Sequence, residues 1–196
     1  MRRLLPERWS DPAAYGAGWS ERNERLLALA DGALPEPEKL DFSEYGCGPH
    51  APFAAAVARA DEAAGRTPRR VHRFDRTRWD EGCGLIDFNE ARFEEAVSSA
   101  VGVLSGVLEY LDDPGAVLAF AARHHRWLLA SYAPVTTPPH KLAPYAAEID
   151  RRAFHHGWRN HLAADALVAL ISRHGFVIRT GLWKGQMLVL AQLAAR

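Results

Sequence analysis

The sequence predicts an α/β protein in which helices flank a mostly parallel sheet. In Leu40–Phe53, an apolar, aromatic-rich stretch of strand length runs into a glycine turn and then an alanine-rich helix. Short apolar runs then alternate with helical patterns along the chain. At the C-terminal end, two strands flank a glycine-containing turn, which predicts that the sheet closes with an antiparallel hairpin.

The expected elements cover most of the chain. Strands are expected at residues 40–45, 69–74, 85–89, 100–104, 126–132, 176–179 and 187–191, and helices at 51–64, 115–124 and 162–173. Pro49 suits the first turn of the first of these helices, where a missing N–H costs nothing. Residues 133–152 contain four prolines and are expected to be a long irregular connection. Asn160 is the expected cap of the last helix.

Residues 1–37 are expected to form an N-terminal helical extension and linker ahead of a domain that spans residues 38–196. The extension would hold a helix over about residues 12–30. Its apolar face would contain Trp19, Leu26, Leu27 and Leu29, and its solvated side Glu21, Arg22, Glu24 and Arg25.

Bulk composition excludes several classes of protein. The chain has 196 residues, which is enough for one well-packed domain. Lys+Arg and Asp+Glu both number 24, so net charge gives no reason to expect a nucleic-acid partner. Two cysteines are too few for a disulfide framework, and we find neither a signal peptide nor an apolar run long enough for a membrane span. We therefore expect a reduced, cytoplasmic protein.

The glycine turn is the centre of the functional interpretation. Gly46 and Gly48 let the backbone turn sharply and approach a ligand. Read literally, residues 46–51 also fit the dinucleotide pattern G-x-G-x-x-G/A. Glu44, two residues before the turn, would repel a pyrophosphate and attract a ligand with an ammonium group.

Three segments together resemble class I S-adenosylmethionine (SAM) methyltransferases that act on small molecules. These are the acidic-x-G-x-G turn at residues 44–48, the segment SGVLEYLDDP at residues 105–114, and Gly-Phe at residues 175–176 before the terminal hairpin. The resemblance covers Glu38 to Leu193 by order of elements. It implies a Rossmann-like three-layer sandwich whose mostly parallel seven-stranded sheet ends in an antiparallel hairpin.

The resemblance also implies which residues would bind SAM. Asp75, after the second strand, would bind the ribose hydroxyls, although a surface aspartate paired with an arginine is the alternative. Asp87 would lie near the adenine amino group, with Phe88 against the ring. The full implied cofactor set is Glu44, Gly46, Gly48, His50, Asp75, Asp87, Phe88, Ser105 and Gly106. His50 departs from the family, which most often has a third glycine there.

Two further expectations concern the N-terminal helix and the connection between strands. In small methyltransferases a helix before the first strand often covers the entrance to the cofactor or substrate site. In this chain, packing of that helix on the edge of the sheet is at least as well supported. The interval from Asp75 to Asp87 is too short for a full helix and a strand, so a turn is expected in place of the helix.

Methyl transfer requires mainly positioning and a dry cavity, because SAM carries the reactive sulfonium. The catalytic candidates are polar groups on the loops at the carboxyl ends of the strands: His155, His156, His161, Tyr132, Glu109 and Tyr110. His155 and His156 are preferred because histidine changes charge near neutrality, although surface histidines are the common alternative. No metal site is expected, because the Cys-x-x-Cys and His-Glu-x-x-His patterns are absent.

The predicted function is SAM-dependent methyl transfer to a small-molecule acceptor, without a nucleic-acid or membrane partner. The sequence leaves the oligomeric state open, a homodimer included. One alternative is a methyltransferase-like protein that has lost catalysis and serves as a binding or scaffold partner, which His50 and the shortened connection favour. Another is a dinucleotide oxidoreductase, which rests on the literal G-x-G-x-x-A match alone.

Overall fold

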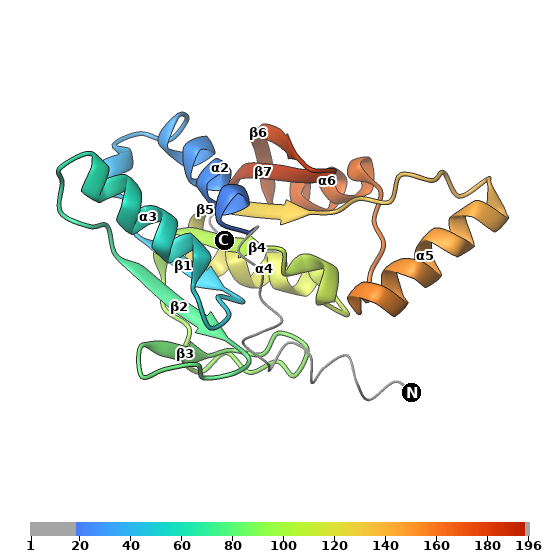
Figure 1. Cartoon of the computed structure of the whole chain (residues 1–196), viewed down its shortest axis with the longest axis horizontal. Helices are drawn as coiled ribbons and strands as arrows, with labels where there is room; N and C mark the ends of the chain where they lie inside the picture. The colour runs from blue at the N-terminus through green and yellow to red at the C-terminus, as the bar shows by residue number, and fades with distance from the viewer. Residues whose placement is uncertain (1–18, 195–196) are drawn as a thin grey trace.

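Seven strands form one sheet in the order β3-β2-β1-β4-β5-β7-β6 (Figure 1). This computed structural model describes residues 19–194. The strands are β1 (Phe42–Tyr45), β2 (Val71–Asp75), β3 (Cys83–Leu85), β4 (Ser99–Ser105), β5 (His125–Tyr132), β6 (Gly175–Trp183) and β7 (Gln186–Leu193). The helices are α2 (Trp19–Asp31), α3 (Pro52–Ala63), α4 (Pro114–His124), α5 (Leu142–His156) and α6 (Ala164–Ser172), with short 3-10 turns η2 (Pro37–Lys39) and η3 (Leu108–Tyr110).

The strand pairing confirms the predicted fold class. β1 lies in the interior of the sheet, where it pairs in parallel with β2 and with β4. The antiparallel part comprises β5, β7 and β6, so the sheet ends in a hairpin. Buried apolar residues along β4 and β5 explain why these strands run through the centre.

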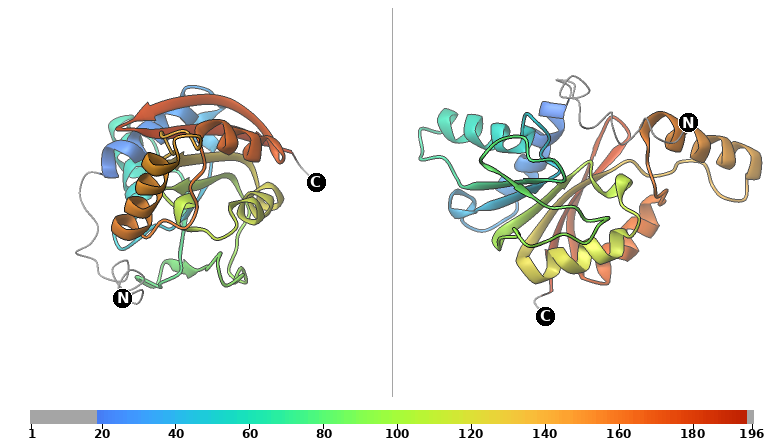
Figure 2. Two further views of the ribbon diagram at one scale, coloured as in Figure 1. Left: turned by 90° about the vertical axis from the view of Figure 1, so that its right-hand side faces the viewer. Right: turned by 90° about the horizontal axis from the view of Figure 1, so that it is seen from below.

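Helices cover both faces of the sheet, which gives the expected three layers (Figure 2). On one face, α2 and α3 pack Leu26, Leu27 and Phe53 against the strands. On the other face, α4 and α6 contribute a second apolar cluster that includes Leu118 and Leu167. Among the described residues, no helix combines the length and apolarity that crossing a bilayer requires.

Helix α2 is integrated into the first of these layers. Leu26 and Ala30 are fully buried against the sheet. The expected start of this helix, residues 12–18, lies outside the described residues, and the division of the chain at residue 37 stays a prediction.

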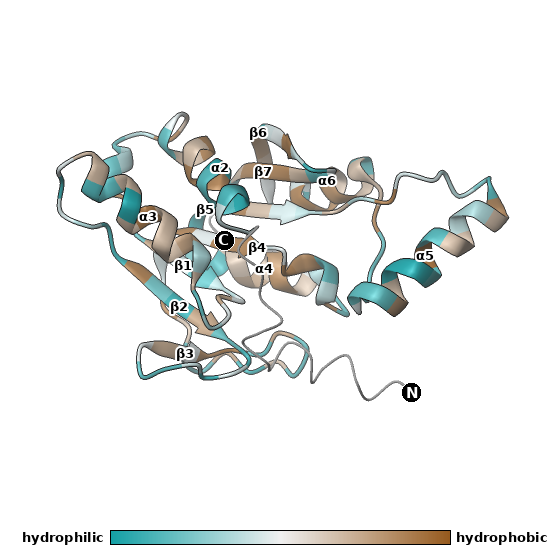
Figure 3. Ribbon diagram, in the orientation of Figure 1, coloured by the Kyte–Doolittle hydropathy of each residue, from teal (hydrophilic) through white to brown (hydrophobic). Residues whose placement is uncertain are grey.

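The predicted irregular connection after β5 was wrong, because residues 142–156 form helix α5. Pro144 falls in the first turn of this helix, where its missing N–H breaks no hydrogen bond. The helix extends away from the sheet, and its most hydrophilic residues lie in its middle and inner part (Figure 3). It is attached by Glu148, which accepts from the Thr137 N–H at 2.9 Å, and by Arg152, which donates to the Pro134 carbonyl at 3.0 Å.

Three local predictions also need correction. Strand β3 covers Cys83–Leu85, and Asp87 follows it in an isolated antiparallel bridge to Arg92. Helix α3 begins at Pro52, so this residue, and not Pro49, occupies the first turn. The cap of α6 is Ala163. The side chain of Asn160 instead binds Tyr132 and the carbonyls of the η3 region.

A polar network lies inside the sheet, around His125. The Tyr45 hydroxyl lies 2.8 Å from Nε2 of His125, and the Ser99 hydroxyl lies 3.1 Å from Nδ1. A Cβ at position 102 would come within 2.5 Å of the imidazole, so Gly102 provides the space for the ring. Burial lowers the pKa of His125 to about 4, so the ring is neutral in the folded protein near neutral pH.

This network predicts an acid-sensitive stability. The unfolded chain binds a proton at His125 below about pH 6.5, whereas the folded protein does so only near pH 4. Stability should therefore fall as pH falls through this window, by about 2 kcal/mol between pH 7.5 and pH 5 from this group. Urea denaturation of the wild type and of the His125→Gln variant at both pH values checks this. The variant should lose the part of the decrease in stability that His125 causes. An equal decrease in both proteins would contradict the assignment.

Candidate functional site

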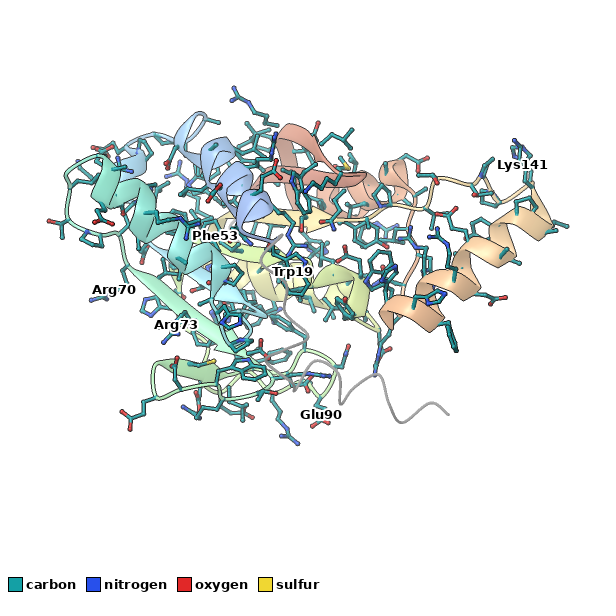
Figure 4. The ribbon with its side chains drawn as sticks, viewed as in Figure 1. Trp19, Phe53, Arg70, Arg73, Glu90 and Lys141 are labelled. Atoms are coloured by element: carbon teal, nitrogen blue, oxygen red, sulfur yellow. The ribbon has the colours of Figure 1, made fainter. Side chains whose placement is uncertain are left out.

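A cavity of about 950 Å³ opens where β1, β2 and β4 end. Its wall combines the glycine turn after β1, the ends of β2 and β4, the segment after β3, and the start of α2. Trp19 marks the α2 side in Figure 4, which also shows Lys141 at the far end of α5. The carboxyl end of a mostly parallel sheet is where open α/β folds bind ligands.

The glycine turn depends on two left-handed residues. Gly46 and Gly48 have φ values of 67° and 60°. A Cβ on Gly46 would lie 2.6 Å from Cγ2 of Val107, so the turn packs directly on the segment that follows β4. Gly46 lines the cavity, whereas Gly48 is buried behind it and donates its N–H to Asp75 at 2.9 Å.

Glu44 is buried at the end of β1, with 1% of its surface exposed. Its two carboxylate oxygens accept the N–H groups of Phe53 and Ala54 at 2.9 and 3.0 Å, so the side chain caps α3. Burial raises the pKa of Glu44 to about 7, against the opposing effect of the two amides. The predicted contact between Glu44 and a ligand's ammonium group would therefore involve a carboxyl group that already binds helix α3 and that burial makes easier to protonate.

Asp75 also lies at the cavity and is already partly engaged. Oδ2 accepts from Gly48, and Oδ1 accepts from the Thr77 N–H at 3.1 Å. Each oxygen keeps a second lone pair for a ligand hydroxyl. The alternative of a surface aspartate paired with an arginine does not fit, because Asp75 is buried and makes no ion pair with a described residue.

Asp87 and Phe88 line the cavity on the segment after β3. The Asp87 carboxylate accepts the N–H groups of Asn89 and Glu90, which tightens this turn. Phe88 packs edge-to-face on Tyr45 with the ring centroids 5.4 Å apart. No helix separates β2 from β3, as the sequence predicted.

Ser105 and Gly106 end β4, and Arg22 reaches them from helix α2. The guanidinium donates to the Ser105 carbonyl at 3.3 Å. Sequence reasoning placed Arg22 in solvent, but only 6% of it is exposed. The signal that was missed is its spacing, because Arg22 lies three residues after Trp19 and four before Leu26, on the apolar face of the helix.

The histidines predicted to act at the site occupy different places. His156 lines the cavity at the end of α5 and stacks on Trp158 with the ring centroids 4.5 Å apart. His155, which is exposed and packs on Phe154, is not part of the cavity wall. His50 is exposed and also outside the wall, so the expected imidazole near the ligand is not found there.

Glu109 is the most deeply buried acidic side chain of the cavity wall besides Glu44. Oε1 accepts the Ala133 N–H at 2.9 Å, while Oε2 has no hydrogen-bond partner among the described residues. Burial raises the pKa of Glu109, and the nearby Arg22 and Arg152 oppose this shift. The hydroxyl of Ser105 is likewise buried without a partner in the described part of the chain. These two buried polar groups could form hydrogen bonds with the polar atoms of a ligand.

Cys47 lies inside the glycine turn, with its Sγ 3.7 Å from the Sγ of Cys83. Both thiols are buried, and burial raises the pKa of Cys47, which disfavours a thiolate nucleophile. Across residues 19–194 no group of histidine, cysteine and acidic side chains is arranged to hold a metal ion.

Comparisons with known proteins bear on the fold. Neither protein-family models nor curated protein sequences match the chain. Among solved structures, the mitomycin 7-O-methyltransferase MmcR superposes with a TM-score of 0.65 at 17% identity, over 93% of this chain and 56% of MmcR. Magnesium protoporphyrin IX methyltransferase (ChlM) from Synechocystis PCC 6803, with bound S-adenosylhomocysteine (SAH), gives 0.60 at 14% identity, over 98% of this chain and 95% of ChlM.

The pyocyanin biosynthetic protein PhzM superposes with a TM-score of 0.59 at 16% identity, over 88% of this chain. This chain spans about half the length of PhzM and of MmcR, and nearly the whole of ChlM. These likenesses, together with the strand order, confirm the class I SAM methyltransferase fold that the sequence resemblance implied.

The role of Glu44 as a cap predicts a loss of stability in Glu44→Ala. The substitution leaves two helix N–H groups without their acceptor, which should cost about 2 kcal/mol. Denaturant unfolding at pH 8, where the Glu44 carboxylate is ionised, measures this. Glu24→Ala is the control, since Glu24 forms only an exposed ion pair with Arg59. A Glu44→Ala variant as stable as the control would refute the capping role.

Proposed function

We propose that this protein transfers a methyl group from SAM to a small-molecule acceptor. The observation that carries the proposal is the cavity at the ends of β1, β2 and β4, which the glycine turn, Asp75 and Asp87 line or support in a methyltransferase fold. Its volume of about 950 Å³ is at the upper end of the usual range of small-molecule sites, roughly 300–1,000 Å³. A site that holds SAM and a compact acceptor together requires a cavity of about this volume.

The residues present fit a nucleoside-containing cofactor. Asp75 keeps acceptor capacity for the ribose hydroxyls, and Phe88 with its aromatic neighbours provides an apolar surface for the adenine. Gly46 allows close backbone approach. Glu44 shapes the turn from within the cavity wall, and Gly48 does so from behind it. When bound, SAM supplies the electrophilic methyl group.

Two structural neighbours support a small acceptor, because MmcR and ChlM are methyltransferases of mitomycin and of magnesium protoporphyrin IX. On this chain, acceptors would enter beside the end of α5. His156 lines the cavity there, which supports our proposal of this residue, in preference to His155, as the candidate proton acceptor. The buried carboxyl of Glu109 is a second candidate at the cavity wall.

Cofactor binding can be tested by calorimetric titration with SAH. Wild-type protein should bind, and Asp75→Asn and Asp87→Asn should each weaken binding about tenfold, because a charge-assisted hydrogen bond is lost. Glu90→Gln is the matched control, since Glu90 is exposed beside Asp87 and pairs with Arg92. In Figure 4, Glu90 lies at the outer edge of the molecule.

Equal weakening in Glu90→Gln would show that the effect is not local to the two aspartates. Absence of any SAH binding to the wild type would argue against the proposed function.

A catalytically inactive binding or scaffold protein is the second candidate. It is favoured by Glu44, because burial raises the pKa of this carboxyl group to about 7 and so weakens the negative charge that would attract the ammonium group of SAM. Turnover separates the two proposals, because methylation of any acceptor by the purified protein removes the scaffold alternative. The dinucleotide alternative has lost support, since the sheet ends in the antiparallel hairpin of methyltransferases.

A further inference from the structure

Arg22 is a buried cation in the wall of the cavity. Within residues 19–194 its hydrogen bonds go to neutral oxygens, the side-chain carbonyl of Gln186 at 3.2 Å and the main-chain carbonyl of Ser105. Nε has no hydrogen-bond partner, and no carboxylate of the described residues forms an ion pair with Arg22. A buried charge without a counter-charge is costly, so proteins normally pair it.

The surrounding structure is built to keep the guanidinium in place. It lies over the Trp19 ring, with Cζ 5.5 Å from the ring centroid. A Cβ at position 106 would come within 2.6 Å of Nη1, so a side chain there would displace the guanidinium from its present position. Gly106 also has a φ of 69°, which side-chain-bearing residues rarely adopt. The end of β4 and the first turn of α2 therefore fit each other at this point.

Glu109 and Glu44 attract Arg22 electrostatically, but no acidic group in the described part of the cavity wall forms an ion pair with it. Glu44 and Asp75 are bound to main-chain N–H groups, and Asp112 forms an ion pair with Arg159. Glu109 attracts Arg22 electrostatically but lies beyond ion-pair distance. Burial favours the protonated form of Glu109, which weakens even that attraction.

We propose that Arg22 binds the carboxylate of a ligand in this cavity. Guanidinium groups recognise carboxylates through paired N–H donors, and the ligand would supply the charge that the protein does not. The proposal rests on the proposed function for the identity of the ligand. The carboxylate belongs either to the amino-acid part of SAM or to the acceptor.

The test compares SAH with 5′-methylthioadenosine, which keeps the nucleoside and thioether but lacks the amino-acid part. Wild-type and Arg22→Met proteins are titrated with each. Arg22→Met keeps a long side chain and removes the charge, and thermal melting verifies that it folds. Arg25→Met is the matched control, because Arg25 lies on the same helix in an exposed pair with Glu21.

If the carboxylate is that of the cofactor, Arg22→Met should lose about 10- to 100-fold in SAH affinity and little in methylthioadenosine affinity. If it is that of the acceptor, SAH affinity is unchanged. In that case benzoate, added to SAH-saturated protein, should bind the wild type and the Arg25→Met control but not Arg22→Met. Unchanged affinity for SAH and for benzoate would overturn the proposal.

Failure of the proposed function gives a separate result. If neither nucleoside binds the wild type, the benzoate titration is run on the protein alone. Binding that Arg22→Met abolishes would then support the carboxylate site without SAM, and a result that does not depend on Arg22 would refute it.

Discussion

The carboxylate of Glu44 binds the free N–H groups at the start of helix α3, and this buried contact determines how strand β1 passes into that helix. Because Glu44 holds the helix from one side, the residues between them must turn within a short length, and Gly46 and Gly48 adopt left-handed conformations to do so. Asp75 binds the same turn from β2. Glu44 and Asp75 thus shape the cavity by accepting main-chain N–H groups, and not only through the charge that they present to a ligand.

The distribution of charge in the cavity follows from this use of the acidic residues. Main-chain amides stabilise Glu44, Asp75 and Asp87, whereas the hydrogen-bond partners of Arg22 among the described residues are neutral. The described part of the cavity therefore has acceptor capacity along the strand ends and, beside Gly106, a positive charge without an ion-pair partner. A ligand that carries hydroxyls and a carboxylate matches both features, and SAM is such a ligand.

Much of the fold follows from patterns local to the sequence. The apolar runs of β4 and β5, the glycine turn and the terminal hairpin were all predictable because each depends on neighbouring residues. Helix α5 was not, since Pro144 looks like a helix breaker unless the helix start is known. Arg22 was assigned to solvent because its burial depends on Gly106, far away in the chain. Whether His50 and His155 line the cavity likewise depends on tertiary packing, which the residue type alone does not predict.

We infer that the cavity at the ends of β1, β2 and β4 holds the cofactor. Amide hydrogen exchange with and without SAH tests its location directly. We expect slower exchange on binding in residues 46–54, 75–77, 86–89 and 105–112, with no change in the outer part of α5. Protection confined to other segments, or no protection at all, would contradict it.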